Sequence, residues 1–201
     1  MLKPSVLSPP VIYLASRSPR RVELLLQIGL QCETLPADID ETQLNQETAQ
    51  NYVIRLARQK AEACIQTLTK TQRERPVLAA DTTVELAGAL LGKPEHDRDA
   101  RTMLNALSGS LHNVHTAVAL AVADHIEVVI STTLVEMMTL TAAQIDAYIA
   151  SGEHKDKAGS YGIQGLASAW IKRIEGSYSG VMGLPIYETA ALLRKHGIIS
   201  I

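Results

Sequence analysis

The chain has 201 residues, of which 46% are hydrophobic and 20% are charged, and its net charge is -2. This length suits one large domain or two tightly joined lobes, and we expect a single domain over residues 1–201. The balanced charge and the scarcity of aromatic residues, with no Phe and one Trp, argue against a nucleic-acid-binding protein.

The predicted secondary structure interleaves strands and helices along the chain. Apolar runs rich in β-branched residues predict strands at 11–15, 77–80, 83–86, 114–123, 126–137 and 167–174. Apolar residues spaced by three and four predict helices at 19–29, 47–68, 97–107, 141–151 and 184–196. Strands 114–123 and 126–137 should pair as an antiparallel hairpin joined by Asp124 and His125. We therefore predict an α/β protein with a mixed twisted sheet and flanking helices.

The helix predicted at residue 19 begins with an unusual charge. Ser18 occupies the position of a helix N-cap, and Pro19 suits the first helical position. Arg20 and Arg21 follow in the first turn, where the helix dipole disfavours cations. A bound anion would resolve this conflict, because backbone N–H groups, the hydroxyls of Ser16 and Ser18 and the guanidinium groups can hold a phosphate together. The alternative is that both arginines face solvent.

Two charged residues fall where the predicted elements should bury them. Lys60 lies seven residues after Val53, on the apolar face of its helix. It either extends to the protein rim, as lysines commonly do, or meets an acidic group or a phosphate in a cleft. Asp81 follows the apolar run 77–80, at the expected carboxyl end of a strand, where α/β sheets tend to bind ligands. A carboxylate there suits a divalent cation or the activation of a water molecule.

Three loops carry further candidate residues. Glu41 is the acidic residue of interest in the loop before the long helix, and Lys93 lies between a glycine and a proline. Lys157 and Gln164 lie in segment 156–165, whose three glycines allow the backbone to approach a ligand closely. These spacings match neither a Walker loop nor a Rossmann fingerprint. A flexible loop without function is the alternative for the glycine-rich segment.

The remaining sequence features predict no zinc, disulfide or membrane segment. Cys32 and Cys64 form no CxxC pair and should pack as small apolar side chains. His112 and His115 are three apart in a predicted strand, so they should face opposite sides of the sheet. No run approaches the roughly 20 apolar residues of a membrane span, and residues 1–10 have the character of neither a signal peptide nor an anchor. We therefore expect a protein of the reducing cytoplasm.

Taken together, these segments resemble the Maf family of nucleoside triphosphate pyrophosphatases over nearly the whole chain. The matching segments are Leu14-Ala15-Ser16 through Arg21 and Glu23, Asp40-Glu41, Tyr52-Val53 with Leu56-Ala57 and Lys60-Ala61, Ala80-Asp81-Thr82, Gly92-Lys93-Pro94, Ser108-Gly109 with His112 and Thr116-Ala117-Val118, Asp156 to Gly165, and Gly183-Leu184-Pro185. The resemblance implies two lobes around a nucleotide-binding cleft, similar to inosine triphosphatases. It also implies metal-dependent hydrolysis of a nucleoside triphosphate to the monophosphate and pyrophosphate.

The resemblance further implies roles for individual residues. Asp81 would accept the proton of the attacking water, and Asp81 and Glu41 would bind Mg²⁺ or Mn²⁺. Whether Asp81 acts mainly as base or as metal ligand is left open. The residues implied to bind substrate are Ser16, Ser18, Arg20, Arg21, Lys60, Thr82, Lys93, Lys157 and Gln164.

The family resemblance also indicates a pyrimidine substrate. The branch that hydrolyses dTTP and UTP has Arg-Arg after Ser-Pro, Thr after the catalytic Asp, and Gln in Ile-Gln-Gly, which this chain matches with Arg20, Thr82 and Gln164. A Gln amide can accept from N3–H of uracil or thymine while it donates to a ring carbonyl. We expect hydrolysis of UTP and dTTP, with modified pyrimidine nucleotides as further candidates. Arg17 departs from the small or polar residue often found there, which could alter affinity.

Two alternatives remain open at this stage. A purine house-cleaning enzyme acting on inosine triphosphate or 7-methyl-GTP would use the same chemistry with another base pocket. A nucleotide-binding regulator of cell division would bind the triphosphate without turnover, since the family has been linked to septum formation. In each case the expected partner is a nucleoside triphosphate, with no nucleic acid and no membrane, and a homodimer is possible.

Overall fold

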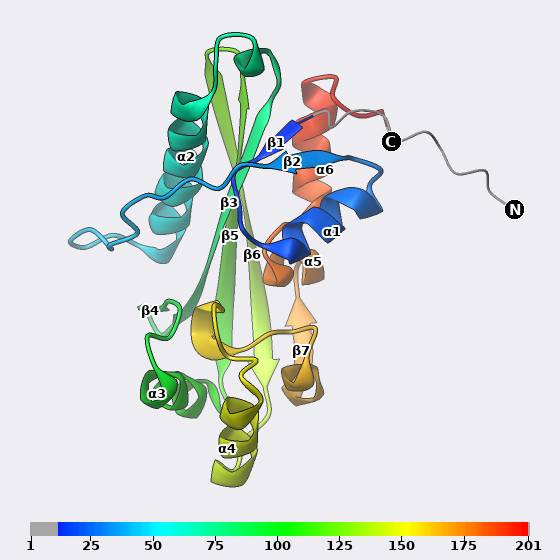
Figure 1. Cartoon of the computed structure of the whole chain (residues 1–201). Helices are drawn as coiled ribbons and strands as arrows, with labels where there is room; N and C mark the ends of the chain where they lie inside the picture. The colour runs from blue at the N-terminus through cyan, green and yellow to red at the C-terminus, as the bar shows by residue number, and fades with distance from the viewer. Residues whose placement is uncertain (1–11, 201) are drawn as a thin grey trace, which may run out of the picture.

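The centre of the protein is a seven-stranded mixed sheet, as seen in a computed structural model that describes residues 12–200 (Figure 1). The strand order is β2-β1-β3-β5-β6-β7, and β4 pairs with a separate part of β3. β1 is parallel to β2 and β3, and the other pairs are antiparallel. The strands are β1 (Ile12–Leu14), β2 (Cys32–Thr34), β3 (Val77–Leu86), β4 (Ala89–Leu91), β5 (Leu111–Val122), β6 (His125–Met137) and β7 (Ile171–Glu175).

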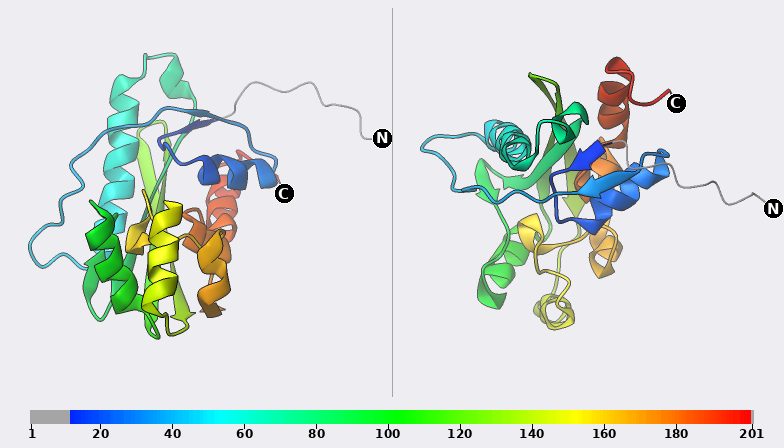
Figure 2. Two further views of the ribbon diagram at one scale, coloured as in Figure 1. Left: turned by 60° about the horizontal axis from the view of Figure 1, so that its bottom comes forward. Right: turned by 45° about the horizontal axis from the view of Figure 1, so that its top comes forward.

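Helices cover both faces of the sheet and its lower end. α2 packs along β3, β5 and β6 on one face, and α1, α5 and α6 lie on the other side (Figures 1 and 2). α3 and α4 pack against each other at the far end of the long strands. The helices are α1 (Pro19–Gln27), α2 (Ala49–Thr67), α3 (Asp97–Leu107), α4 (Ala142–Ser151), α5 (Tyr178–Met182) and α6 (Ile186–Lys195), with 3-10 turns η1 (Gln72–Glu74), η2 (Ala158–Ser160) and η3 (Leu166–Trp170).

The two faces of the sheet are packed differently. On the α2 side, β3 and β5 present alanines such as Ala79, Ala117 and Ala119, which let the helix approach closely. The opposite side is filled by larger side chains, including Leu78 and Leu120. The mixed α/β architecture predicted from the sequence is therefore confirmed, and the hairpin β5–β6 forms its longest ladder.

Several predicted boundaries are wrong. The strands expected at 77–80 and 83–86 are one continuous strand, so Asp81 lies in the middle of β3 rather than at its carboxyl end. The β5–β6 loop consists of Ala123 and Asp124, since Val122 pairs directly with His125. The strand expected at 167–174 starts only at residue 171, because 166–170 forms a 3-10 helix. Local patterns missed β2, β4 and α5, which span only three, three and five residues.

The buried polar residues follow the predicted alternation. His112 and His115 face opposite sides of β5, as expected: His112 Nε2 lies 2.8 Å from the Tyr161 hydroxyl, and His115 Nε2 lies 3.0 Å from Glu85. Cys64 is buried and Cys32 half-buried, and both carry free thiols. Within residues 12–200, no helix has the length and apolar character needed to cross a membrane. The start of the strand expected at 11–15 lies outside the described residues.

One edge of β3 is left open between two short partners. β1 pairs with β3 only at Val77 and Leu78, and β4 begins its pairing at Val84. Between these points, no strand within residues 12–200 pairs with this edge, although β5 continues along the other edge. Asp81 and Thr82 lie in this unpaired part of β3, and both line a cleft.

Candidate active site

A cleft of about 790 Å³ opens at this gap in the sheet. All of the predicted catalytic, metal-binding and substrate-binding residues line it, although they come from α1, α2, β3 and four loop segments. The sequence-predicted lining residues are Ser16, Ser18, Arg20, Arg21, Glu41, Lys60, Asp81, Thr82, Lys93, Lys157 and Gln164. The fold thus brings together residues that are up to 148 positions apart in the chain, as with Ser16 and Gln164.

Lys60 lies between two carboxylates at the centre of the cleft. Its Nζ is 2.5 Å from Oδ1 of Asp81 and 2.7 Å from Oε1 of Glu41. Lys60 is only 9% exposed and Asp81 only 6%, so this contact is shielded from water. Of the two positions considered from the sequence, extension to the rim is wrong and contact with an acidic group is confirmed.

Burial and charge act in opposite directions on the two carboxylates. Burial raises the pKa of Asp81, and the neighbouring Lys60 and Arg21 charges only partly offset this effect. Burial alone would also raise the pKa of Glu41, but hydrogen bonds and attraction from Lys60 and Lys93 lower its pKa overall. Asp81 is therefore the more basic of the two groups, as proton transfer from a water requires.

Arg21 is held in a fixed orientation by three acceptors. Its Nε donates to the carbonyl of Gly183 at 2.7 Å, and its two terminal nitrogens donate to Ser16 Oγ at 3.0 Å and Thr82 Oγ1 at 3.3 Å. A guanidinium has five N–H donors, so two remain for a ligand once these contacts within the described chain are counted. Burial lowers the pKa of Arg21, but a guanidinium stays charged. Arg21 is therefore an oriented side chain rather than a solvated one, and its guanidinium, called here the Arg21 fork, has the geometry to bind an anion.

The serines at the start of α1 are arranged around this fork. Ser18 occupies the N-cap position and Pro19 the first helical position, as predicted. The backbone N–H of Ser18 donates to Ser16 Oγ at 3.1 Å, and the Ser18 side chain makes no capping bond with the described residues. Because Ser16 Oγ also accepts from Arg21, both of its acceptor positions are used. Its O–H donor is left for a ligand.

Thr82 links the arginine to the interior of the sheet. Its Oγ1 lies 2.9 Å from Thr116 Oγ1, and the Thr116 hydroxyl donates to the carbonyl of Gly180 at 2.7 Å. Thr116 and Gly183 lie in segments that match the family, but the sequence indicates no role for either residue. No local signal could reveal these partners, since Gly183 is 162 residues from Arg21.

The other cations occupy the rims of the cleft. Lys93 Nζ lies 3.7 Å from Glu41 Oε2, and its side chain is 58% exposed. Lys157 donates to the carbonyls of Glu153 and Lys155, and burial lowers its pKa. Arg17, by contrast, forms an exposed ion pair with Asp38 at 2.8 Å and points to the surface.

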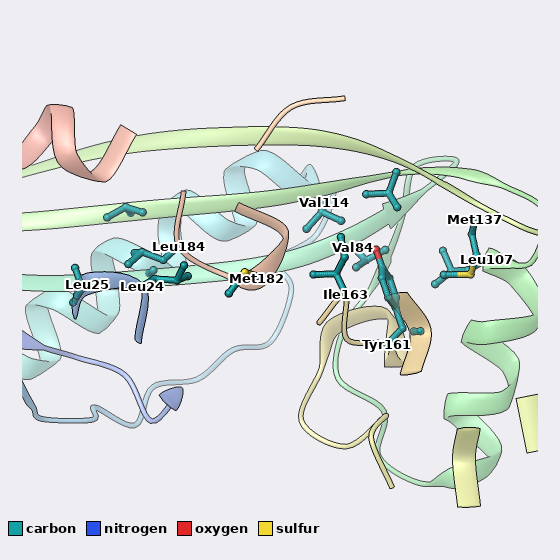
Figure 3. Close-up of a cluster of buried hydrophobic side chains, with 14 of the residues drawn as sticks. Leu24, Leu25, Val84, Leu107, Val114, Met137, Tyr161, Ile163, Met182 and Leu184 are labelled. Carbon is teal, nitrogen blue, oxygen red and sulfur yellow. The ribbon is translucent and has the colours of Figure 1, made fainter. Parts of the chain in front are cut away.

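An apolar wall adjoins the charged centre. Val84 and Val114 of the sheet, together with Tyr161, Ile163 and Met182, line the cleft and continue into the main core (Figure 3). Figure 3 shows the Tyr161 ring and Ile163 beside Val84. A flat, partly apolar ligand group suits such a wall, whereas the arginine and lysine side suits phosphate.

The two carboxylates have the chemistry of a divalent-cation site. Glu41 and Asp81 each place an oxygen within 2.7 Å of the same Lys60 nitrogen, so their oxygens converge on one small region. Within residues 12–200 there is no cluster of three or more His, Cys, Asp or Glu that could hold a metal. Mg²⁺ commonly uses one or two protein carboxylates and completes its coordination with water and substrate phosphate. The donor set fits that pattern.

Comparison with known proteins places the chain in a family. A family model described as "Maf-like protein" matches residues 11–196. The dTTP/UTP pyrophosphatase of Methylobacillus flagellatus is 57% identical over 93% of each chain, and that of Bordetella parapertussis is 54% identical over 94% of each. The dTTP/UTP pyrophosphatase of Chromobacterium violaceum is 52% identical over 92% of this chain and 94% of its own.

A partial structural likeness was also found. The Ham1 protein of Staphylococcus aureus aligns with a TM-score of 0.45 and 18% identity, over 63% of this chain and 71% of its own. A TM-score this low does not bear on the assignment. The family-model match and the high identity to the three bacterial relatives show that this chain belongs to the Maf-like protein family.

Proposed function

We propose that this protein hydrolyses dTTP and UTP to the nucleoside monophosphate and pyrophosphate, in the presence of Mg²⁺ or Mn²⁺. Several relatives named dTTP/UTP pyrophosphatase support this proposal through their similarity over most of the chain. The structural observation that carries it is the buried Lys60 between Asp81 and Glu41, in the same cleft as the Arg21 fork. Binding alone would not require a buried, basic carboxylate beside an anion site.

The proposed reaction begins with attack of a water oxygen on the α-phosphorus. A bond forms between this oxygen and the phosphorus, and the bond from the α-phosphorus to the bridging oxygen breaks, so the electron pair leaves with pyrophosphate. Asp81 Oδ accepts the proton that the water loses. The burial that raises the pKa of Asp81 makes the carboxylate a stronger base for this step.

Positive charge in the cleft would stabilise the departing pyrophosphate. The Arg21 guanidinium and the free O–H of Ser16 would donate to phosphate oxygens, with Arg20 and Lys93 at the rim of the cleft. Lys60 would keep both carboxylates in position as the charge redistributes. A divalent cation on Glu41 and Asp81 would supply further stabilisation of negative charge on the phosphates.

The base would lie toward the apolar wall and Gln164. Ile163 is 5% exposed and belongs to the core, whereas the next residue, Gln164, is exposed and lines the cleft. The Gln164 amide would read the uracil or thymine edge by accepting from N3–H and donating to a carbonyl. We also infer a cytoplasmic location, which the free thiols of Cys32 and Cys64 support.

The proposal is tested by measuring pyrophosphate release from UTP, dTTP, CTP, GTP, inosine triphosphate and 7-methyl-GTP, with Mg²⁺ or Mn²⁺. We expect turnover of UTP and dTTP that collapses in Asp81→Asn. A preference for a purine would contradict the assignment of Gln164, and tight triphosphate binding without turnover would contradict the enzymatic function.

A further inference from the structure

The turn that carries Gln164 is held at both ends by residues outside the cleft centre. Residues 162–165 form a four-residue turn closed by the Gly165 N–H, which donates to the Gly162 carbonyl at 3.1 Å. Within this turn, Ile163 is buried and Gln164 is exposed. The position of the Gln164 amide therefore depends on what holds the turn.

Two side chains from one helix region accept the N–H groups that flank the turn. Tyr148 Oη accepts from the Gly162 N–H at 3.0 Å, and Glu153 Oε2 accepts from the Leu166 N–H at 2.9 Å. Tyr148 belongs to α4, and Glu153 lies two residues beyond its end. The turn is thus held at its first residue, Gly162, by α4 and at the residue after its last, Leu166, by the segment that follows α4.

The first of these acceptors is rigid. Tyr148 is 2% exposed, and its ring centroid lies 4.9 Å from that of Trp170. Burial raises the pKa of Tyr148 to about 12, so the hydroxyl stays neutral and its oxygen remains an acceptor at neutral pH. A buried aromatic ring with two rotatable bonds is a suitable support for a backbone contact.

The second acceptor, Glu153, packs closely against Gly165 of the turn. A Cβ added to Gly165 would lie 2.0 Å from Glu153 Oε2, so the carboxylate occupies the space that any side chain at this position would need. In the same way, a Cβ on Gly162 would lie 2.7 Å from Cε of Lys157. Lys157 itself donates to the Glu153 carbonyl. The two glycines therefore leave room for the Glu153 and Lys157 side chains in the positions that they occupy next to the turn.

We propose that Glu153 and Tyr148 are positioning residues for base selection, acting through the turn that presents Gln164. This inference rests on the proposed function, in which Gln164 reads the pyrimidine. Removing either acceptor would leave a backbone N–H without its partner and allow the turn to move, so the amide would lose its fixed orientation. Asp81, Lys60 and the Arg21 fork lie on other elements and would keep their geometry.

The test compares kcat and KM for UTP and CTP in the full-length protein. We expect Glu153→Ala to raise the KM for UTP and to lower the ratio of kcat/KM for UTP over CTP by about tenfold, the scale of one hydrogen bond to a charged group. Glu153→Gln retains an acceptor oxygen and should keep most of the preference. Tyr148→Phe keeps the ring packing and should lower the ratio in the same direction.

Two further variants separate positioning from general destabilisation. Thr141→Ala removes the N-cap at the opposite end of the same helix, and we expect it to lower the melting temperature without changing the UTP to CTP ratio. In a Gln164→Ala background, Glu153→Ala should have no further effect on the ratio, because the two residues act through one contact.

The outcomes distinguish this inference from the proposed function. A wild-type protein that hydrolyses neither UTP nor dTTP would refute both. A wild-type protein that is active and selective, with an unchanged UTP to CTP ratio in Glu153→Ala and Tyr148→Phe, would refute only the positioning role. If Glu153→Ala does not fold, Tyr148→Phe and Glu153→Gln decide the question by the same ratio.

Discussion

Replacing Lys60 with methionine should destabilise the protein more than most single substitutions. Methionine keeps a long unbranched side chain but removes the ammonium group that lies 2.5 Å from Asp81. With Asp81 only 6% exposed, its carboxylate would be buried without its hydrogen-bonded cation, and only the charge of Arg21 would offset this burial. Removing one member of a buried ion pair costs about 3–5 kcal/mol. The Glu41 side chain is 39% exposed, so water screens it and its share of this cost is small.

This cost is large enough to measure by thermal or urea unfolding at neutral pH in buffer with EDTA. For a chain of 201 residues, each kcal/mol shifts the melting temperature by about 2–4 °C, so the expected decrease is about 10 °C. The double variant Lys60→Met with Asp81→Asn removes both charges and should recover much of the loss. Addition of Mg²⁺ should stabilise Lys60→Met more than the wild type, because the cation would occupy the region between the two carboxylates.

Two results would show that the Lys60–Asp81 ion pair does not stabilise the fold in this way. A loss of less than about 1 kcal/mol in Lys60→Met would show that the buried pair is stabilised little by its mutual charge. An equal loss in the wild-type and Asp81→Asn backgrounds would show that Lys60 acts through packing rather than through Asp81.

Substitutions of Arg21, His112 and Gly159 test three other parts of the structure. Arg21→Lys should lower kcat/KM for UTP by about 100-fold, because an ammonium cannot reproduce the three oriented donors. The control Arg17→Lys, at an exposed ion pair, should change kcat/KM less than about threefold. Equal effects of the two substitutions would contradict the role assigned to Arg21. Burial lowers the pKa of His112 from 6.5 to about 4, so the stability that its neutral form contributes above pH 6.5 should fall by about 3 kcal/mol as the pH approaches 4. Unfolding free energies measured from pH 7 to pH 4 should show a smaller loss in His112→Gln than in the wild type. An identical pH profile in the two proteins would contradict this role of His112. Gly159→Ala should lower the melting temperature, since its φ is +66° and the new Cβ would lie 2.9 Å from Val84 Cγ2; no decrease in a calorimetric scan would show that this turn adapts.

The sequence predicted the local parts of the site well because their signals are local. Ser18 and Pro19 mark the start of α1 by capping chemistry, and the two arginines after them conflict with the helix dipole. Lys60 is conspicuous because it breaks an otherwise apolar helix face, and the structure confirms its contact with an acidic group. In each case a single helix shows both the regular pattern and the residue that departs from it.

The parts that could not be predicted depend on distant or very short elements. Asp81 was expected at a strand end because the apolar run stops there, but pairing with β5 carries the strand on to Leu86. The edge of β3 opposite β5 has no partner strand between Leu78 and Val84 within the described chain, and Asp81 lines the cleft in this stretch. The gap is a property of strand register rather than of composition. The Glu153 contact with Leu166 is likewise tertiary, and no spacing rule indicates it.

In the proposed reaction, water attacks the α-phosphorus and Asp81 is the base. A single turnover of UTP in oxygen-18-labelled water, followed by mass spectrometry of both products, tests it most directly. We expect one labelled oxygen in UMP and none in pyrophosphate, and no reaction in Asp81→Asn. Label in pyrophosphate or in orthophosphate would place the attack on another phosphorus and rule out the proposed reaction.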